Sequence, residues 1–126
     1  MLIEILKPDF EFEDERGTII QLVREGYRQV NFITSRKASS RGGHFHKQNE
    51  EAFYVIKGKF RLTVSKGSQT ENYNFKKNDF FKIPAGVEHS FEFHTETCLI
   101  SLYSKGVELK NGDKDIYEGG TSQKAK

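Results

Sequence analysis

Apolar and polar residues alternate along several short segments of this chain. In segment 59–65, Phe60, Leu62 and Val64 alternate with polar residues, and segments 87–93 and 97–103 have the same two-residue period. This period places the apolar side chains on one face of a β-strand. No segment has the 3.6-residue spacing of an amphipathic helix over a useful length. The pattern therefore predicts a chain of β-strands.

Turn signals rich in glycine, proline and asparagine separate these segments. Lys57-Gly58 and Pro84-Ala85-Gly86 are two of them, and strands follow one another about every 8–12 residues. Short strands at this spacing are typical of an all-β sandwich or barrel. The expected strands are 18–23, 27–34, 51–56, 59–65, 70–75, 80–83, 87–93 and 97–103.

The length of the chain and a change in composition near residue 105 indicate its domain organisation. The 126 residues fit one domain of the usual size, about 100–150 residues. We expect residues 1–105 to form the barrel, with residues 1–12 as an edge strand or arm. Residues 106–126 are polar and rich in lysine and glycine, which predicts a partly disordered tail. Within it, Ile116 and Tyr117 could dock on the barrel or on a partner chain.

Candidate chemistry gathers in segment 41–58. His44 and His46 are two residues apart, so on a strand both imidazoles point to the same face. Glu51 follows a short polar loop, and its carboxylate returns to the same place if it begins the next antiparallel strand. Two imidazoles and a carboxylate are ligands of divalent metal ions in proteins. The isolated pattern is also compatible with a polar hairpin that carries two solvated imidazoles.

His89 is the best candidate for a further ligand. It shares a strand face with Phe91 and Phe93, where an imidazole without a polar partner is unfavourable. A metal ion would supply that partner. His94 has the opposite strand parity and is expected to be exposed. The predicted ligand set is His44, His46, Glu51 and His89.

Composition and charge exclude several classes of protein. The formal net charge of +2 is small and the basic residues are scattered, which argues against a nucleic-acid or membrane partner. The N-terminus lacks the features of a signal peptide, and no stretch approaches the ~20 apolar residues of a membrane span. The single cysteine, Cys98, excludes an internal disulfide and favours a reducing compartment. We therefore expect a cytoplasmic protein.

The two histidine segments resemble the two motifs of the cupin superfamily. GHFH at residues 43–46, four residues, Glu51, six residues and Gly58 match the first motif, and residues 84–89 match the PxGxxH of the second. Phe93 departs from the second motif, which often ends with Asn. The resemblance implies an all-β fold, a single jelly-roll barrel or double-stranded β-helix, with the metal inside near one open end.

Two adjacent glutamates compete for the carboxylate position in this motif. Glu51 has the family spacing in both directions, four residues after His46 and six before Gly58. It also shares strand parity with Phe53, so it is interior if Phe53 is. Glu50 then faces solvent or supports the site from outside.

Within the cupins, segments 41–58 and 81–93 look most like the C-terminal cupin domain of bifunctional capsular-polysaccharide nucleotide-sugar reductases, and next like 3,4-ketoisomerases of deoxysugar pathways. This resemblance implies an epimerase or isomerase that transfers a proton next to the ketone of a nucleotide-linked keto-sugar in polysaccharide biosynthesis. One divalent ion, among Zn, Ni, Mn and Fe, would polarise the ketone. In some cupin sugar isomerases the histidines instead act as acid and base without metal, which makes His44 and His46 the candidate catalytic pair.

Two other functions stay open, because one fold hosts many chemistries. Fe(II) in the same four-ligand site would serve a small-molecule dioxygenase. A non-catalytic cupin that binds a metal or a small ligand is the other alternative.

Two arginines are candidates for substrate binding. Arg16, in the polar turn 13–17, could reach the barrel mouth as a bidentate clamp for phosphate. A D-x-R-G turn at this place resembles an early motif of sugar-nucleotide cupins. Arg41, with Arg36 and Lys37 on the loop before the histidines, either belongs to a solvated face or helps to bind an anionic ligand. Both arginines could equally be solvated side chains.

Strand edges favour a homodimer. Exposed strands in the N-terminal arm and the outer-face residues Tyr54 and Ile56 would be covered if two barrels paired. The expected partners are therefore a second copy of the chain and a small-molecule substrate such as a nucleotide-sugar.

Overall fold

The computed structural model describes residues 1–119, and the regular elements of this part of the chain are all β-strands. They agree with the eight expected strands to within two residues at each end and add four short ones. No helix among residues 1–119 is long and apolar enough to cross a membrane. The strands are β1 (Glu4–Ile5), β2 (Phe10–Asp14), β3 (Gly17–Gln21), β4 (Gln29–Ser35), β5 (Ser40–Phe45), β6 (Glu51–Lys57), β7 (Lys59–Lys66), β8 (Gln69–Lys76), β9 (Phe80–Ile83), β10 (Glu88–Phe93), β11 (Thr97–Tyr103) and β12 (Tyr117–Glu118).

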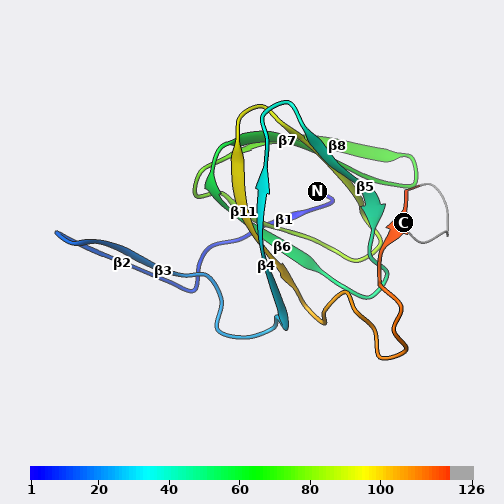
Figure 1. Ribbon diagram of the computed structural model, residues 1–126, viewed down its shortest axis with the longest axis horizontal. Helices are drawn as coiled ribbons and strands as arrows, with labels where there is room; N and C mark the ends of the chain where they lie inside the picture. The colour runs from blue at the N-terminus through cyan, green and yellow to red at the C-terminus, as the bar shows by residue number, and fades with distance from the viewer. Residues whose placement is uncertain (120–126) are drawn as a thin grey trace.

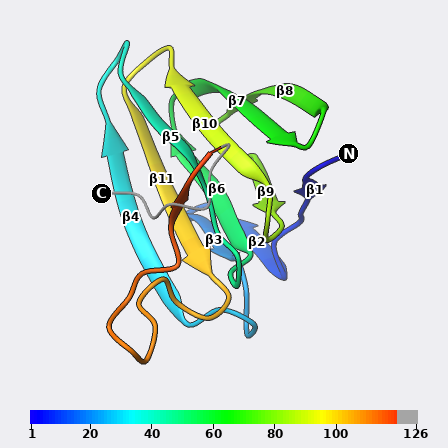
Figure 2. The ribbon, with the colours of Figure 1, turned by 90° about the vertical axis from the view of Figure 1, so that its right-hand side faces the viewer.

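Two five-stranded antiparallel sheets form the walls of a barrel. One has the strand order β1-β9-β6-β11-β4 and the other β12-β5-β10-β7-β8. The consecutive strands β4 and β5 lie in different sheets, as do β6 and β7, so the chain passes repeatedly from one wall to the other. Figures 1 and 2 show these walls around a common interior. The prediction of an all-β jelly-roll barrel is confirmed.

Aromatic side chains fill much of the space between the walls. The rings of Phe75 and Phe81 stack with their centroids 4.1 Å apart, and Phe60 contacts both. The alternation of apolar and polar residues in β7 reflects this packing, because Phe60, Leu62 and Val64 all point inward and are fully buried. Burial of each such side chain contributes about 1.5–3 kcal/mol, so the phenylalanines hold the two walls together.

The outer face of β6, β9 and β11 is covered by the chain itself. Tyr54, Phe80 and Leu102 are buried there, and apolar residues of segment 6–27 pack over them. Tyr54 is only 7% exposed in the single chain, so a second barrel is not needed to cover it.

Two apolar surfaces remain exposed on this side of the molecule. The hairpin of β2 and β3 projects away from the barrel (Figure 1) and exposes Phe10, Phe12 and Ile19. Strand β4, which lies at the edge of its sheet, exposes Val30 and Phe32. These surfaces, unlike Tyr54, offer apolar area to a partner.

The C-terminal segment returns to the barrel after an exposed loop and ends along β5. Strand β12 pairs with β5, so that Tyr117 is opposite Phe45, and the two rings stack with centroids 5.6 Å apart. Tyr117 thus docks on its own barrel, one of the two possibilities left by the sequence. Of the tail 106–126 that was predicted to be partly disordered, residues 120–126 lie outside the described residues.

Candidate metal centre

Three imidazoles and a carboxylate meet between the two sheets. His44 on β5 and His89 on β10 are directly opposite each other in the strand register, and His46 follows the last residue of β5. The ligand nitrogens of the three histidines lie within 4.8 Å of one another. Glu51, the first residue of β6 in the opposite sheet, places its Oε1 3.0 Å from Nε2 of His46 and 3.6 Å from Nε2 of His89. The structure therefore brings the three predicted histidines together and places Glu51 against two of them.

A close approach of β5 to β10 fixes the position of His89. Gly42 has a φ of +110°, a backbone conformation that residues other than glycine rarely adopt. A Cβ atom at this position would lie 2.5 Å from the carbonyl oxygen of His89. The register of β10 against β5 shifts between His89 and Ser90, and the Ser90 Oγ accepts a hydrogen bond from the Gly43 N–H at 3.0 Å. The two glycines before the histidines are therefore part of the construction of the site.

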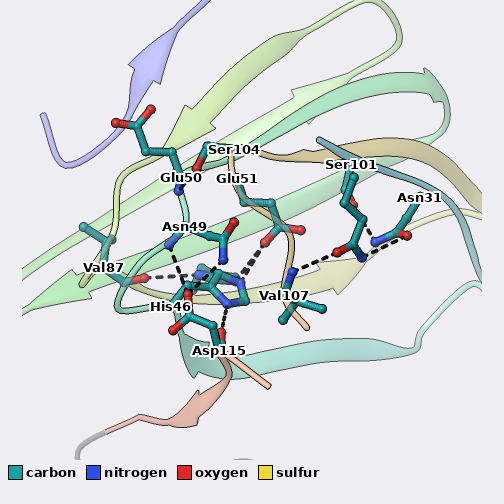
Figure 3. A network of polar contacts seen from close by, with 12 residues as sticks. Asn31, His46, Asn49, Glu50, Glu51, Val87, Ser101, Ser104, Val107 and Asp115 are labelled. Atoms are coloured by element: carbon teal, nitrogen blue, oxygen red, sulfur yellow. Dashed lines mark hydrogen bonds and ion pairs between the residues drawn. The ribbon is translucent and has the colours of Figure 1, made fainter. Parts of the chain in front are cut away.

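Backbone carbonyls orient the two most buried histidine rings. Nδ1 of His46 is 2.6 Å from the carbonyl oxygen of Asp115, and Nδ1 of His89 is 3.1 Å from that of Val87. Because a carbonyl oxygen only accepts hydrogen bonds, Nδ1 carries a proton in both rings. Each ring then turns its Nε2 toward Glu51. Figure 3 shows His46 between the Asp115 backbone and the Glu51 carboxylate.

The contact between His46 and Glu51 needs a positive charge. A neutral imidazole protonated on Nδ1 has a lone pair on Nε2, and a carboxylate also presents lone pairs. At 3.0 Å these two acceptors repel unless a proton or a cation lies between them. A divalent ion about 2.0–2.2 Å from each atom satisfies both, and carbonyl-bonded Nδ1 atoms are usual for metal-bound histidines. Nδ1 of His44, a buried atom without a hydrogen-bond partner among the described residues, also needs a partner. The residues therefore fit a divalent ion.

Burial and the Glu51 carboxylate act in opposite directions on the imidazoles. Burial lowers the pKa of His89 to about 4 in spite of the nearby carboxylate. Burial and then the charge of His46 lower the pKa of His44. Burial also disfavours the charged form of His46, but the hydrogen bond and charge of Glu51 outweigh it and raise the pKa of His46. His44 and His89 are thus neutral near pH 7, the state that metal ligation requires.

A cavity of about 390 Å³ opens beside the histidines. Phenylalanine, leucine and isoleucine side chains form one part of its wall, and polar residues that include His44, Glu51 and Tyr103 form the other. Its volume is typical of small-molecule sites, about 300–1,000 Å³. The arrangement can hold a small, partly polar molecule next to the candidate metal centre. The lining residues are Ile33, Ser40, Arg41, Gly42, His44, Glu51, Phe53, Phe91, Phe93, Leu99 and Tyr103.

The two arginines singled out from the sequence lie in different places. Arg41 lines the cavity, and its guanidinium donates to Ser35 Oγ at 2.8 Å and to the carbonyl oxygen of Thr34 at 3.0 Å. Arg16 lies at the tip of the β2–β3 hairpin, is exposed, and pairs with Asp14. The structure therefore places Arg41, but not Arg16, beside the histidines of the same chain.

Two buried polar residues next to His46 were not found from the sequence. Asn49 and Asp115 are both 0% exposed and hydrogen-bond to each other. No local sequence pattern links these two residues, which are 66 positions apart. The one available signal was that Asp115 stands directly before the apolar pair Ile116-Tyr117. Glu50, the other glutamate, points outward, where its carboxylate is 3.1 Å from Lys82 Nζ.

One family model covers most of the chain. The model described as the polysaccharide biosynthesis C-terminal domain matches residues 12–116. This range contains all four candidate ligands and Asp115.

Two curated proteins are similar to part of the chain. A UDP-2-acetamido-2,6-beta-L-arabino-hexul-4-ose reductase from Pseudomonas aeruginosa is 28% identical over 100 residues, which are 75% of this chain and 27% of the reductase. A quercetin 2,3-dioxygenase from Bacillus subtilis is 30% identical over 79 residues, 62% of this chain and 22% of the dioxygenase. The chain therefore spans about a quarter of the length of these relatives.

Solved structures include proteins of the same fold. A variant of a 3,4-ketoisomerase from Thermoanaerobacterium thermosaccharolyticum, in complex with TDP-4-keto-6-deoxyglucose, superimposes with a TM-score of 0.71. The match covers 82% of this chain and 80% of the ketoisomerase at 19% identity. At this identity the likeness establishes the shared fold.

Proposed function

The chain belongs to the polysaccharide biosynthesis C-terminal domain family, and on this premise we propose that it is a metal-binding cupin that isomerises or epimerises a nucleotide-linked keto-sugar. The observation that carries the proposal is the group of three imidazoles and Glu51 beside a cavity of about 390 Å³. The relatives support the substrate class, because one is named as a reductase of a UDP-linked hexulose and another was solved with a TDP-linked keto-sugar.

The proposed chemistry is proton transfer at the carbon next to a ketone. A divalent ion held by the four candidate ligands would act as a Lewis acid on the keto oxygen. Tyr103 lines the same cavity; burial and then the charge of Glu51 raise its pKa, so its hydroxyl stays protonated and can donate a proton. If the site works without metal, His44 is the candidate base, since its Nδ1 is unpaired and its pKa is lowered. His46, whose pKa is raised, is then the candidate acid.

A second hollow supports a place for the diphosphate. It adjoins the cavity, because Ser40 and Arg41 line both. Arg36, three further hydroxyl-bearing residues and one acidic residue, Glu96, also line it. Guanidinium groups bind phosphate oxygens in pairs. In this proposal the sugar occupies the cavity, the diphosphate occupies the second hollow, and Arg41 lies between them.

A homodimer and a role for Arg16 are proposed together. The exposed apolar residues of the β2–β3 hairpin and of β4 give a second copy a surface to bind. Arg16, at the tip of the projecting hairpin (Figure 1), would contribute to substrate binding only in the barrel of that second copy. The cytoplasmic location stays a prediction that rests on the single cysteine and on the lack of a signal-peptide pattern and of a long apolar stretch in the sequence.

Hydrogen exchange into the substrate tests the reaction class. The protein, loaded with Zn²⁺, Ni²⁺, Mn²⁺ or Fe²⁺, is incubated in D₂O with a TDP- or UDP-linked 4-keto-6-deoxysugar and followed by proton NMR. We expect the signal of the hydrogen next to the ketone to disappear at a catalytic rate, and His44→Ala to abolish the effect. Exchange no faster than in buffer, for every ion and for both nucleotides, would reject the proposal.

The likeness to quercetin 2,3-dioxygenase favours a second candidate function, oxygenation of a small molecule at Fe(II) in the same site. Protein reconstituted anaerobically with Fe(II) is exposed to O₂ together with flavonol or sugar substrates. Substrate-dependent O₂ consumption without deuterium exchange would favour this candidate. Metal binding with neither activity would favour a non-catalytic binding cupin.

A further inference from the structure

Asp115 anchors the C-terminal segment to the loop after the candidate ligand His46. Its carboxylate is fully buried and accepts hydrogen bonds from the backbone N–H groups of Lys47 at 2.9 Å, Gln48 at 2.9 Å and Asn49 at 3.0 Å. These bonds outweigh the cost of burial and lower the pKa of Asp115. One side chain from the end of the chain thus fixes three consecutive residues beside the site.

Asn49 fastens the other end of the same segment. Its Nδ2 donates to Asp115 Oδ2 at 2.9 Å and to the carbonyl oxygen of Gly106 at 2.9 Å. Its Oδ1 accepts from the backbone N–H groups of Lys105 at 2.9 Å and Gly106 at 3.0 Å. Both donors and both lone pairs of the buried amide are therefore used, and residues 105–118, which we call the strap, are held at two points. Figure 3 shows Asn49 and Asp115 next to His46.

The strap also reaches the ligand His46 directly. The backbone carbonyl of Asp115 accepts the Nδ1–H of His46 at 2.6 Å. This bond selects the tautomer that leaves Nε2 free and directs Nε2 at Glu51. Without the strap, the described residues give Nδ1 of His46 no other hydrogen-bond acceptor.

Beyond Asp115, the strap covers the free edge of β5. Tyr117 pairs with Phe45 and Glu118 with His44 in the strand register. Lys47 Nζ lies 4.1 Å from the centre of the Tyr117 ring, a cation–π contact that closes over the same loop. Strand β5, which carries His44, is therefore held between β10 and β12.

We propose that the strap preorganises the candidate metal centre. Asp115 is the positioning residue that sets the tautomer and orientation of His46. Docking of the strap and binding of a divalent ion then stabilise each other. This inference rests on the metal site of the proposed function. The coupling is reciprocal. If the site binds the ion more tightly when the strap is docked, then the bound ion must also stabilise the docked strap.

Metal affinity in matched variants tests the positioning role. Zn²⁺ affinity is measured by competition with a chromophoric chelator for the wild type, Asp115→Ala, Asp115→Asn and Asp113→Asn. We expect both Asp115 variants to bind Zn²⁺ about 10–100-fold more weakly, as is usual when a partner of a ligating histidine is lost. Asp113, an exposed residue two positions away on the same segment, is the control and should change affinity less than about twofold. Wild-type affinity in folded Asp115→Ala would overturn the proposal.

Two measurements on the chain itself keep the test independent of the proposed function. Long-range proton–nitrogen NMR of the metal-free protein at mildly alkaline pH should show His46 protonated on Nδ1 in the wild type and a tautomer mixture in Asp115→Ala. An unchanged tautomer would overturn the positioning claim even if no metal binds.

Amide exchange at Asp115, whose N–H donates to Val107 O at 2.7 Å, should slow at least tenfold in wild-type protein when Zn²⁺ is added. Equal exchange with Zn²⁺ bound and with chelator would overturn the coupling.

Discussion

At the residue scale, the two nitrogens of the buried imidazoles have separate partners. In His46 and His89, Nδ1 donates to a backbone carbonyl and Nε2 faces Glu51. This division leaves the Nε2 lone pairs available to a cation, while the carbonyls prevent the rings from turning away. His44 differs, because its Nδ1 has no hydrogen-bond partner among the described residues and its ring lines the cavity.

The lowered pKa of His89 predicts how the metal-free protein responds to acid. Its pKa is about 4 when folded and 6.5 by reference when unfolded, so between these values the unfolded state binds more protons. Stability is therefore retained above pH 6.5 and lost as pH falls toward 4, by up to about 3 kcal/mol for this group. The pKa of His46 is raised, so protonation of this group stabilises the folded protein, and its contribution to stability is lost as pH rises.

Urea unfolding with chelator across this pH window checks the expectation. The wild type should lose more free energy of unfolding than His89→Gln as pH falls, because the variant lacks the titrating group. Parallel curves for the two proteins would show that His89 is not held neutral by burial.

At the scale of elements, the close antiparallel pairing of β5 with β10 is the contact on which His44 and His89 depend. Gly42→Ala should destabilise the protein by about 2–5 kcal/mol, because its φ is unfavourable for alanine and the added methyl meets the His89 carbonyl. Gly43→Ala is the matched control. Gly43 also has positive φ but no atom within 4 Å of an added Cβ, so about 1–2 kcal/mol is expected. Equal losses in chemical denaturation would contradict the role given to the close approach.

The sequence predicted the parts of the site that short-range patterns, such as residue spacing and strand parity, can indicate. His44, His46 and Glu51 lie close together in the sequence, although β5 and β6 belong to different sheets and do not pair as the sequence suggested. Strand parity correctly placed Glu51 inside with Phe53 while Glu50 turned to Lys82. The rest depends on distant contacts. The buried partners of Asp115 lie more than 60 residues away, so no spacing or period in the sequence marks it.

Arg16 shows a different limit of sequence reasoning. The turn around it was predicted correctly, since Asp14 and Gly17 close the hairpin of β2 and β3. The direction of the hairpin was not, because it follows from how segment 6–27 packs over the outer face of β6 and β11. A motif fixes local backbone geometry, whereas the place of its side chain depends on the packing of the whole sheet.

At the scale of the whole molecule, the exposed apolar surfaces predict self-association. Phe32 on edge strand β4 and Phe12 on the hairpin are 66% and 44% exposed, and burying aromatic area of this kind drives association. Sedimentation should show a dimer for the wild type and a shift to monomer for Phe32→Asp and Phe12→Asp. Thr70→Asp, an exposed position on β8 in the other sheet, is the control and should stay dimeric. A wild-type monomer at high micromolar concentration would contradict the prediction.

The most direct test of the central claim is the metal content of the purified protein, measured by elemental analysis with the adjacent glutamates as a matched pair. The account predicts about one divalent ion per chain in the wild type and in Glu50→Gln, whose side chain faces Lys82. It predicts loss of most of that metal in Glu51→Gln, which replaces the carboxylate next to His46 with a neutral amide, and in His44→Ala, which removes an imidazole from the cluster. A folded wild type that neither contains a divalent ion nor takes one up from solution would contradict the metal centre and leave the histidines as acid and base.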